Sequence, residues 1–205
     1  DIARATISLL KFEPSLKKQL QMTSVAKVDL RPLEVIAGLS ELPLLLKLMS
    51  VCPLPDLELE NLLRQLRASL LLSISDITGS PEEVAFQSAL ALQCFTNEYV
   101  YYESNEENRL IVELQDSISQ CVLISEQPEV TKILCLACYR PLHVYNWCKK
   151  LKSIDCLEEV NERLLEEPLL ELSIARRIPA LEAISDPVSL KVRKQYEENP
   201  YPRWV

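Results

Sequence analysis

The chain has 205 residues, and 48% of them are hydrophobic, which is enough to bury a sizeable core. The 30 acidic side chains outnumber the 22 basic ones, so the net charge is −8 and we expect neither a nucleic-acid backbone nor an anionic membrane surface as partner. Only two glycines are present, where an average chain of this length holds about fourteen. Phosphate loops and nucleotide-binding turns depend on glycine, so this composition excludes most of that architecture.

The first part of the chain predicts short helices separated by prolines. Leucine, lysine and glutamate favour the helical state, and each proline limits how far a helix can continue. We expect helices over residues 1–11, 14–21, 32–38 and 42–51, a connection over 22–31, and a turn at CPLPD.

The clearest helix of the sequence covers residues 56–73. An apolar stripe recurs there at the i, i+3, i+4, i+7 spacing of an amphipathic helix. It consists of Leu59, Leu62, Leu63, Leu66 and Leu70. The polar residues Arg64, Gln65 and Arg67 lie off this stripe.

Two capping boxes mark the starts of further helices. Ser80 is followed by Pro81 and Glu83, so serine can cap, proline fits the first helical position, and the glutamate can bond back to the cap. Ser104 and Glu107 repeat the pattern and open a helix that we expect to reach about residue 124.

Prolines delimit the helices of the remaining chain. We expect a helix from Pro128 that breaks near Pro141, and a last helix from Asp186-Pro187 to about residue 197. The stretch 168–187 is rich in proline, and extended segments are expected in it. No alternating strand series and no repeat near 34 residues is visible. The predicted fold is therefore all-α: an irregular multi-helix bundle of about eight to ten helices, with no Rossmann sheet.

Seven cysteines at uneven spacing are typical of a reducing compartment. Cys94 and Cys135 lie in the apolar runs LALQCF and KILCLAC, where a free cysteine acts as a small buried hydrophobe. We expect a cytoplasmic protein.

One cysteine and histidine spacing matches the ligand spacing of a small zinc knuckle. It joins Cys135, Cys138, His143 and Cys148. The flanks are apolar, helical and free of glycine, so we interpret these residues as buried members of a helix pair and expect no metal. A zinc site or a thiol enzyme using His143, the only histidine, stays as the alternative. We name no catalytic residue.

The segment 97–102, NEYVYY, is unusually rich in aromatic residues for a helix end. Such residues either pack a helix terminus against its neighbours or form a surface for a partner, and both interpretations stay open.

The last stretch, QYEENPYPRW, is the most specific motif of the sequence. Pro200 and Pro202 hold an extended path along which Tyr201, Arg203 and Trp204 are displayed. This motif resembles the junction segment of bacterial proteins that join tetratricopeptide repeats to a class I S-adenosylmethionine-dependent methyltransferase domain. Earlier phrases resemble the middle region of the same family from about residue 42 onward: LPLLLKLMSVCPLPDLELENLLRQLR, ALALQCFTNEYVYYESNEE, LACYRPLH and IPALEAISDPVSLKVRKQYEENPYPRW.

The resemblance implies a chain cut from a longer protein, with a helical domain over 1–185 and a junction over 186–205. The catalytic strand with its glycine-rich turn and the repeats are missing, so S-adenosylmethionine is implied for the parent protein and no cofactor for this chain. The implied role is a linker and interaction module between the preceding repeats and the following methyltransferase domain; a stand-alone scaffold for a protein partner is the alternative. The residues implied to wall the parent's cofactor cleft are Tyr196, Asn199, Tyr201, Arg203 and Trp204.

Overall fold

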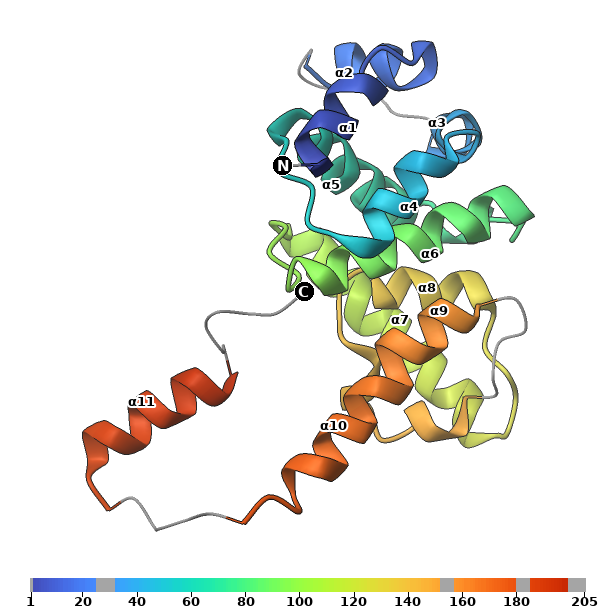
Figure 1. Ribbon diagram of the computed structural model, residues 1–205. Coiled ribbons are helices and arrows are strands. Elements are labelled where there is room, and N and C mark those ends of the chain that lie inside the picture. Colours follow the sequence, from blue (N-terminus) through green and yellow to red (C-terminus); the bar gives the residue numbers. More distant parts are fainter. Residues whose placement is uncertain (1, 25–31, 152–156, 180–184, 199–205) are drawn as a thin grey trace. The chain divides into compact units, whose positions relative to one another are not determined.

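The computed structural model describes residues 2–24, 32–151, 157–179 and 185–198. These residues form an all-α structure without a strand, which confirms the predicted fold class (Figure 1). Ten helices are present in the described ranges when α9, a π turn and α10 are counted as one continuous helix.

The α-helices follow the predicted boundaries closely. They are α1 Ile2–Leu10, α2 Pro14–Ser24, α3 Pro32–Ser40, α4 Pro43–Val51, α5 Leu57–Leu72, α6 Pro81–Thr96, α7 Asn105–Leu123, α8 Val130–Ala137, α9 Glu158–Asn161, α10 Glu167–Ala175 and α11 Pro187–Glu198. The short elements are the 3-10 turns η1 Ile74–Asp76, η2 Leu142–Val144 and η3 Cys148–Lys150, and the π turn η4 Glu162–Glu166.

The chain divides into two compact units, Asp1–Pro168 and Leu169–Val205. In the first unit, α6 lies at the centre and packs against α3, α4, α8 and α9 (Figure 1). Phe86, Leu90 and Cys94 of α6 are fully buried there. The division of the parent protein at residue 185 stays a prediction.

Helix α5 forms where the leucine stripe predicted it. The carboxylate of Asp56 accepts a hydrogen bond from the backbone N–H of Leu59 at 3.0 Å and caps the helix. All five leucines of the stripe are buried. Arg67, which lies off the stripe, is nevertheless only 1% exposed, because α7 and α8 also pack against α5. The leucine stripe alone therefore underestimates how much of the surface of α5 is buried.

Both capping boxes form. Ser80 accepts from the N–H of Glu83 at 3.3 Å, and the Glu83 carboxylate accepts from the N–H of Ser80 at 3.1 Å. At α7, Ser104 accepts from Glu107 N–H at 3.1 Å, and Glu107 accepts from Ser104 N–H at 2.8 Å. These reciprocal bonds satisfy donors that a helix start otherwise leaves free.

Several boundaries differ from the prediction. Helix α2 continues to Ser24, into the predicted connection over residues 22–31, and α3 continues to Ser40 rather than residue 38. Helix α8 begins at Val130 rather than Pro128 and ends at Ala137, four residues before Pro141, whose ring would clash with the carbonyl of Ala137 in a continued helix. Within the proline-rich stretch 168–187, residues 168–175 belong to α10, so the expected extended segments do not lie in that part of it. The π turn η4 ends two residues before Pro168. Its i→i+5 hydrogen bonds replace the α-helical pattern over Glu162–Glu166, close to the point where Pro168 has no N–H to donate.

The helix lengths and compositions also bear on membranes. No helix within the described ranges is both long and apolar enough to span a bilayer.

Candidate functional site

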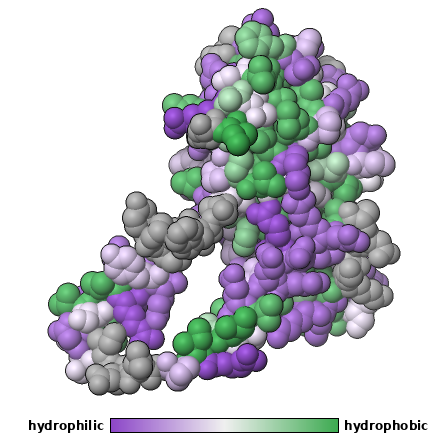
Figure 2. Space-filling model, viewed as in Figure 1, coloured by the Kyte–Doolittle hydropathy of each residue, from purple (hydrophilic) through white to green (hydrophobic). Residues whose placement is uncertain are grey.

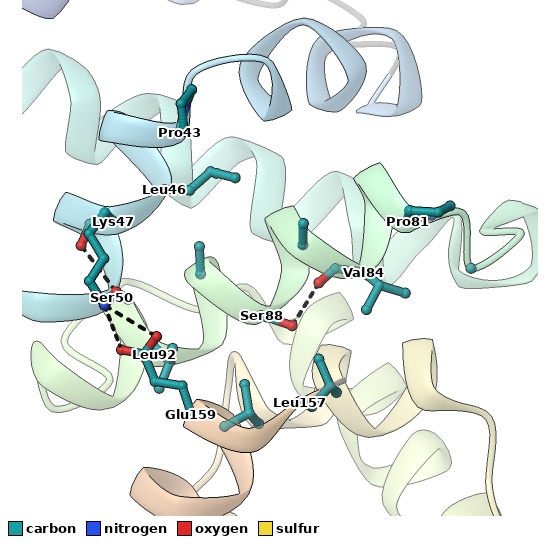
Figure 3. Close-up of a pocket in the computed structure, with 14 residues that line it drawn as sticks. Pro43, Leu46, Lys47, Ser50, Pro81, Val84, Ser88, Leu92, Leu157 and Glu159 are labelled. Carbon is teal, nitrogen blue, oxygen red and sulfur yellow. Dashed lines mark hydrogen bonds and ion pairs between the residues drawn. The ribbon is translucent and has the colours of Figure 1, made fainter. Parts of the chain in front are cut away.

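An apolar groove lies in the first unit between α4, α6 and α9 (Figure 3). Its volume is about 630 Å³, within the range of ligand sites in proteins. Helix α4 contributes Pro43, Leu46, Lys47 and Ser50, α6 with its preceding turn contributes Gly79, Pro81, Val84, Ala85, Ser88, Ala89 and Leu92, and α9 with its N-cap contributes Leu157, Glu159 and Val160. We refer to this set as the α4/α6/α9 groove.

The wall that α6 presents to the groove is built from small side chains. Ala85, Ser88 and Ala89 are spaced like one face of a helix, and Ala85 is exposed. The hydroxyl of Ser88 donates to the carbonyl of Val84 at 2.7 Å, so its polar atom is satisfied within α6 (Figure 3). This wall therefore offers a shallow apolar surface that another chain can approach closely.

A polar cluster closes one side of the groove. Lys47 Nζ lies 3.4 Å from Glu159 Oε1 and joins α4 to α9 (Figure 3). Arg163 donates to the carbonyl of Ser50 and, at 3.2 Å, to the hydroxyl of Thr96. The Lys47 and Glu159 side chains are 63% and 43% exposed, so solvent weakens this pair and a competing charge can displace it.

A buried polar cluster lies apart from the groove lining and centres on Arg67. Arg67 Nη2 donates to the carbonyl of Tyr102 at 2.9 Å and lies 3.7 Å from Glu107 Oε1. The guanidinium carbon is 4.1 Å from the ring centroid of Tyr139 and 5.5 Å from that of Tyr101. Tyr139 donates its hydroxyl to Glu107 Oε1 at 2.8 Å. The four side chains form a cation–π and ion-pair cluster, the Arg67 cluster, that ties α5, α7 and the end of α8 together.

The aromatic segment 97–102 contributes mainly to this packing. Tyr101 is buried against Arg67, and burial raises the pKa of Tyr99 and Tyr101 well above the usual range of tyrosine. Val100 and Tyr102 are 68% and 71% exposed. Packing therefore accounts for Tyr99 and Tyr101, and the interpretation as a partner surface keeps the exposed residues Glu98, Val100 and Tyr102.

The structure disperses the four residues of the zinc-like spacing. Cys135 and Cys138 are buried, and burial raises the pKa of the Cys135 thiol to about 12. Burial and the neighbouring Cys94 thiol raise the pKa of Cys138 as well. In the parts of the chain that the structure describes, no three His, Cys, Asp or Glu side chains are grouped to hold a metal ion. These thiols are protonated at neutral pH, which disfavours nucleophilic or redox chemistry at this pair.

His143 and Cys148 lie after the end of α8. His143 belongs to η2, and Cys148 begins η3 with its thiol 3.7 Å from the carbonyl of His143. Burial raises the pKa of the Cys148 thiol too.

The predicted cleft wall falls largely outside the described residues. Tyr196 lies on α11 and is 59% exposed. Asn199, Tyr201, Arg203 and Trp204 lie beyond residue 198, outside the described ranges. The wall stays a prediction.

Sequence reasoning missed both the groove and the Arg67 cluster. The groove combines helices that are far apart in the chain, since Lys47 of α4 and Glu159 of α9 are 112 residues apart, and no local pattern predicts that they meet. Glu107 was recognised as a capping residue, but its second role beside Arg67 and Tyr139 has no spacing pattern that reveals it.

Comparisons with known proteins add no identification: no family model, no curated protein and no solved structure matches this chain.

Proposed function

We propose that this chain is a helical linker and interaction module of a class I S-adenosylmethionine-dependent methyltransferase that also carries tetratricopeptide repeats. The motif resemblance described above supports the identity of the neighbouring domains. The exposed apolar face of α11 supports the linker role, and it is the observation on which the proposal rests.

Helix α11 has the composition of a helix that packs on another surface. Val188, Val192 and Tyr196 recur at the i, i+4, i+8 spacing and share one face. They are 67%, 44% and 59% exposed. A helix of 12 residues is marginally stable by itself in water, and burial of its apolar face supplies the missing stabilisation.

The second unit exposes further apolar side chains on α10. Leu170, Leu172 and Ile174 are 59%, 46% and 42% exposed, and Figure 2 shows apolar surface along α10 and on α11. In the proposed parent protein the unit from Leu169 onward contacts the methyltransferase domain through these residues. The segment from Tyr196 to Trp204 then lies beside the cofactor cleft, while S-adenosylmethionine itself is held by the methyltransferase domain.

The gene sequence beyond the codon of Val205 tests the identity of the neighbour. We expect a hydrophobic strand followed by an acidic-x-Gly-x-Gly turn, the cofactor cradle of a class I methyltransferase. A continuation without a strand and glycine turn contradicts the proposal.

Calorimetric titration tests the docking face. The domain encoded after Val205 is produced separately and titrated into the 205-residue chain. Val192→Asp places a charge in the apolar face and should weaken binding by tenfold or more, about 1.4 kcal/mol, whereas Lys194→Asp on the opposite side of α11 should not. Equal effects of the two variants, or no binding of the unaltered chain, contradict docking through this face.

A further inference from the structure

The α4/α6/α9 groove has the dimensions of a helix-binding site. Its α6 wall runs from Pro81 to Leu92, and eleven residue steps of an α-helix span about 16 Å. Three turns of a second helix cover the same length. A groove of this form matches the recognition mode in which an amphipathic helix places its apolar face between two or three helices.

The α6 wall also permits close approach. Ala85, Ser88 and Ala89 carry one or two heavy atoms beyond Cα, and helix axes come nearest where such small side chains face each other. Leu46, Leu92 and Leu157 supply larger apolar surfaces around them. The apolar side chains of an incoming helix therefore meet both a flat wall and flanking leucines.

The charges around the groove favour a basic partner. Lys47 is the one cation among the lining residues of the described chain, and Glu159 pairs both with it, at 3.4 Å, and with Arg163, at 3.6 Å. Glu82, next to the lining residue Pro81, is exposed, and α9 adds the exposed Glu158. Carboxylates thus flank the groove at the start of α6 and along α9, and the whole chain carries a net charge of −8.

We propose that the α4/α6/α9 groove binds a basic amphipathic helix of a partner protein. Leucine-like side chains of the partner lie on Ala85, Ser88 and Ala89, and its flanking lysine or arginine side chains meet Glu159 and Glu82. A cation placed at Glu159 competes with Lys47 and Arg163 for the same carboxylate, and because Lys47 is exposed, its ion pair is the one that the partner displaces at least cost. This site does not involve α11, and its test is independent of the methyltransferase proposal.

Two designed peptides serve as probes. Each has about 16 residues so that the helix is long enough to form, with the same leucine and alanine face and either lysine or glutamate on the other face. Fluorescence anisotropy at about 0.15 M salt measures their binding to the 205-residue chain. The lysine peptide should bind at least about tenfold more tightly than the glutamate peptide.

Matched variants locate the binding site. Ala85→Trp fills the groove and should weaken binding of the lysine peptide by about tenfold or more, while Ala37→Trp, the same change at an exposed position of α3, should leave it unchanged. Glu159→Lys should remove most of the preference for the lysine peptide. Circular dichroism and thermal melting confirm that each variant folds.

Amide chemical shifts of the unaltered chain give a readout that needs no variant. The lysine peptide should shift resonances of α4, α6 and α9. Equal binding to Ala85→Trp, equal binding of both peptides, shifts confined to other helices, or binding of a small apolar dye in the groove with no binding of either peptide would each overturn the proposal.

Discussion

Arg67 shows how one residue acquires a role that its sequence position does not reveal. Its guanidinium is wholly buried between the rings of Tyr139 and Tyr101, and Glu107 supplies the countercharge at 3.7 Å. Removing one charge from a buried pair leaves the other uncompensated, which is more damaging than replacing both. Glu107 also accepts bonds from Tyr139 and from Ser104, so it links the Arg67 cluster to the N-terminus of α7.

We expect Arg67→Met to lower the free energy of unfolding by about 3–5 kcal/mol, because the buried Glu107 carboxylate loses its countercharge. Urea denaturation followed by circular dichroism measures the change. The control is Arg64→Met on the same helix, where the half-buried arginine bonds to Asn61, and its effect should stay within about 1 kcal/mol. Similar losses in both variants would show that the Arg67 cluster contributes no more than the half-buried Arg64 does.

At the scale of elements, local chemistry decides where the helices begin and end. The start of α6 depends on Glu83, whose carboxylate oxygen accepts from the backbone N–H groups of Thr78, Gly79 and Ser80 at 2.7 to 3.1 Å. Gly79 has a positive φ of 77°, the conformation in which glycine is not strained. This arrangement holds the turn before α6, which in turn positions Pro81 and Gly79 at the edge of the α4/α6/α9 groove.

Glu83→Ala should therefore lower the free energy of unfolding by about 2–3 kcal/mol, since three backbone N–H donors in partly buried hydrogen bonds lose a charged acceptor. Ser80→Ala removes only the single cap bond and should cost about 1 kcal/mol. Glu82→Ala changes the exposed neighbour in the same helical turn and should stay within about 0.5 kcal/mol. Chemical denaturation ranks the three variants, and an effect of Glu83→Ala no larger than that of Glu82→Ala would refute the role of this carboxylate.

At the scale of the whole molecule, the first unit is organised around α6, against which α3, α4, α8 and α9 pack. Three thiols, Cys94, Cys135 and Cys138, lie in this core rather than at a reactive surface. Burial raises the pKa values of Cys135 and Cys138, and this affects global stability, because the unfolded chain ionises these two thiols near their ordinary pKa while the folded chain holds them protonated.

Stability should accordingly fall as the pH rises above about 9, where unfolded thiols lose protons, and for Cys135 the fall should continue toward its folded pKa of about 12. Cys135→Ala should flatten this dependence by up to about 1.4 kcal/mol per pH unit. Urea denaturation at a series of pH values gives the slopes. The matched control is Cys121→Ala at a half-buried site on α7, and an unchanged slope in Cys135→Ala would contradict the buried, protonated thiol.

The sequence alone determined the helical class and most helix boundaries of this protein. Scarce glycine, the leucine stripe of α5 and the two capping boxes act over a few residues, so their effect is readable without knowing what packs where. The tertiary structure decided which helices pack together and which helices are buried by neighbours on more than one face. Burial of Arg67 and formation of the α4/α6/α9 groove depend on contacts between residues far apart in the chain, and a polar side chain such as Arg67 carries no local sign that partners will surround it.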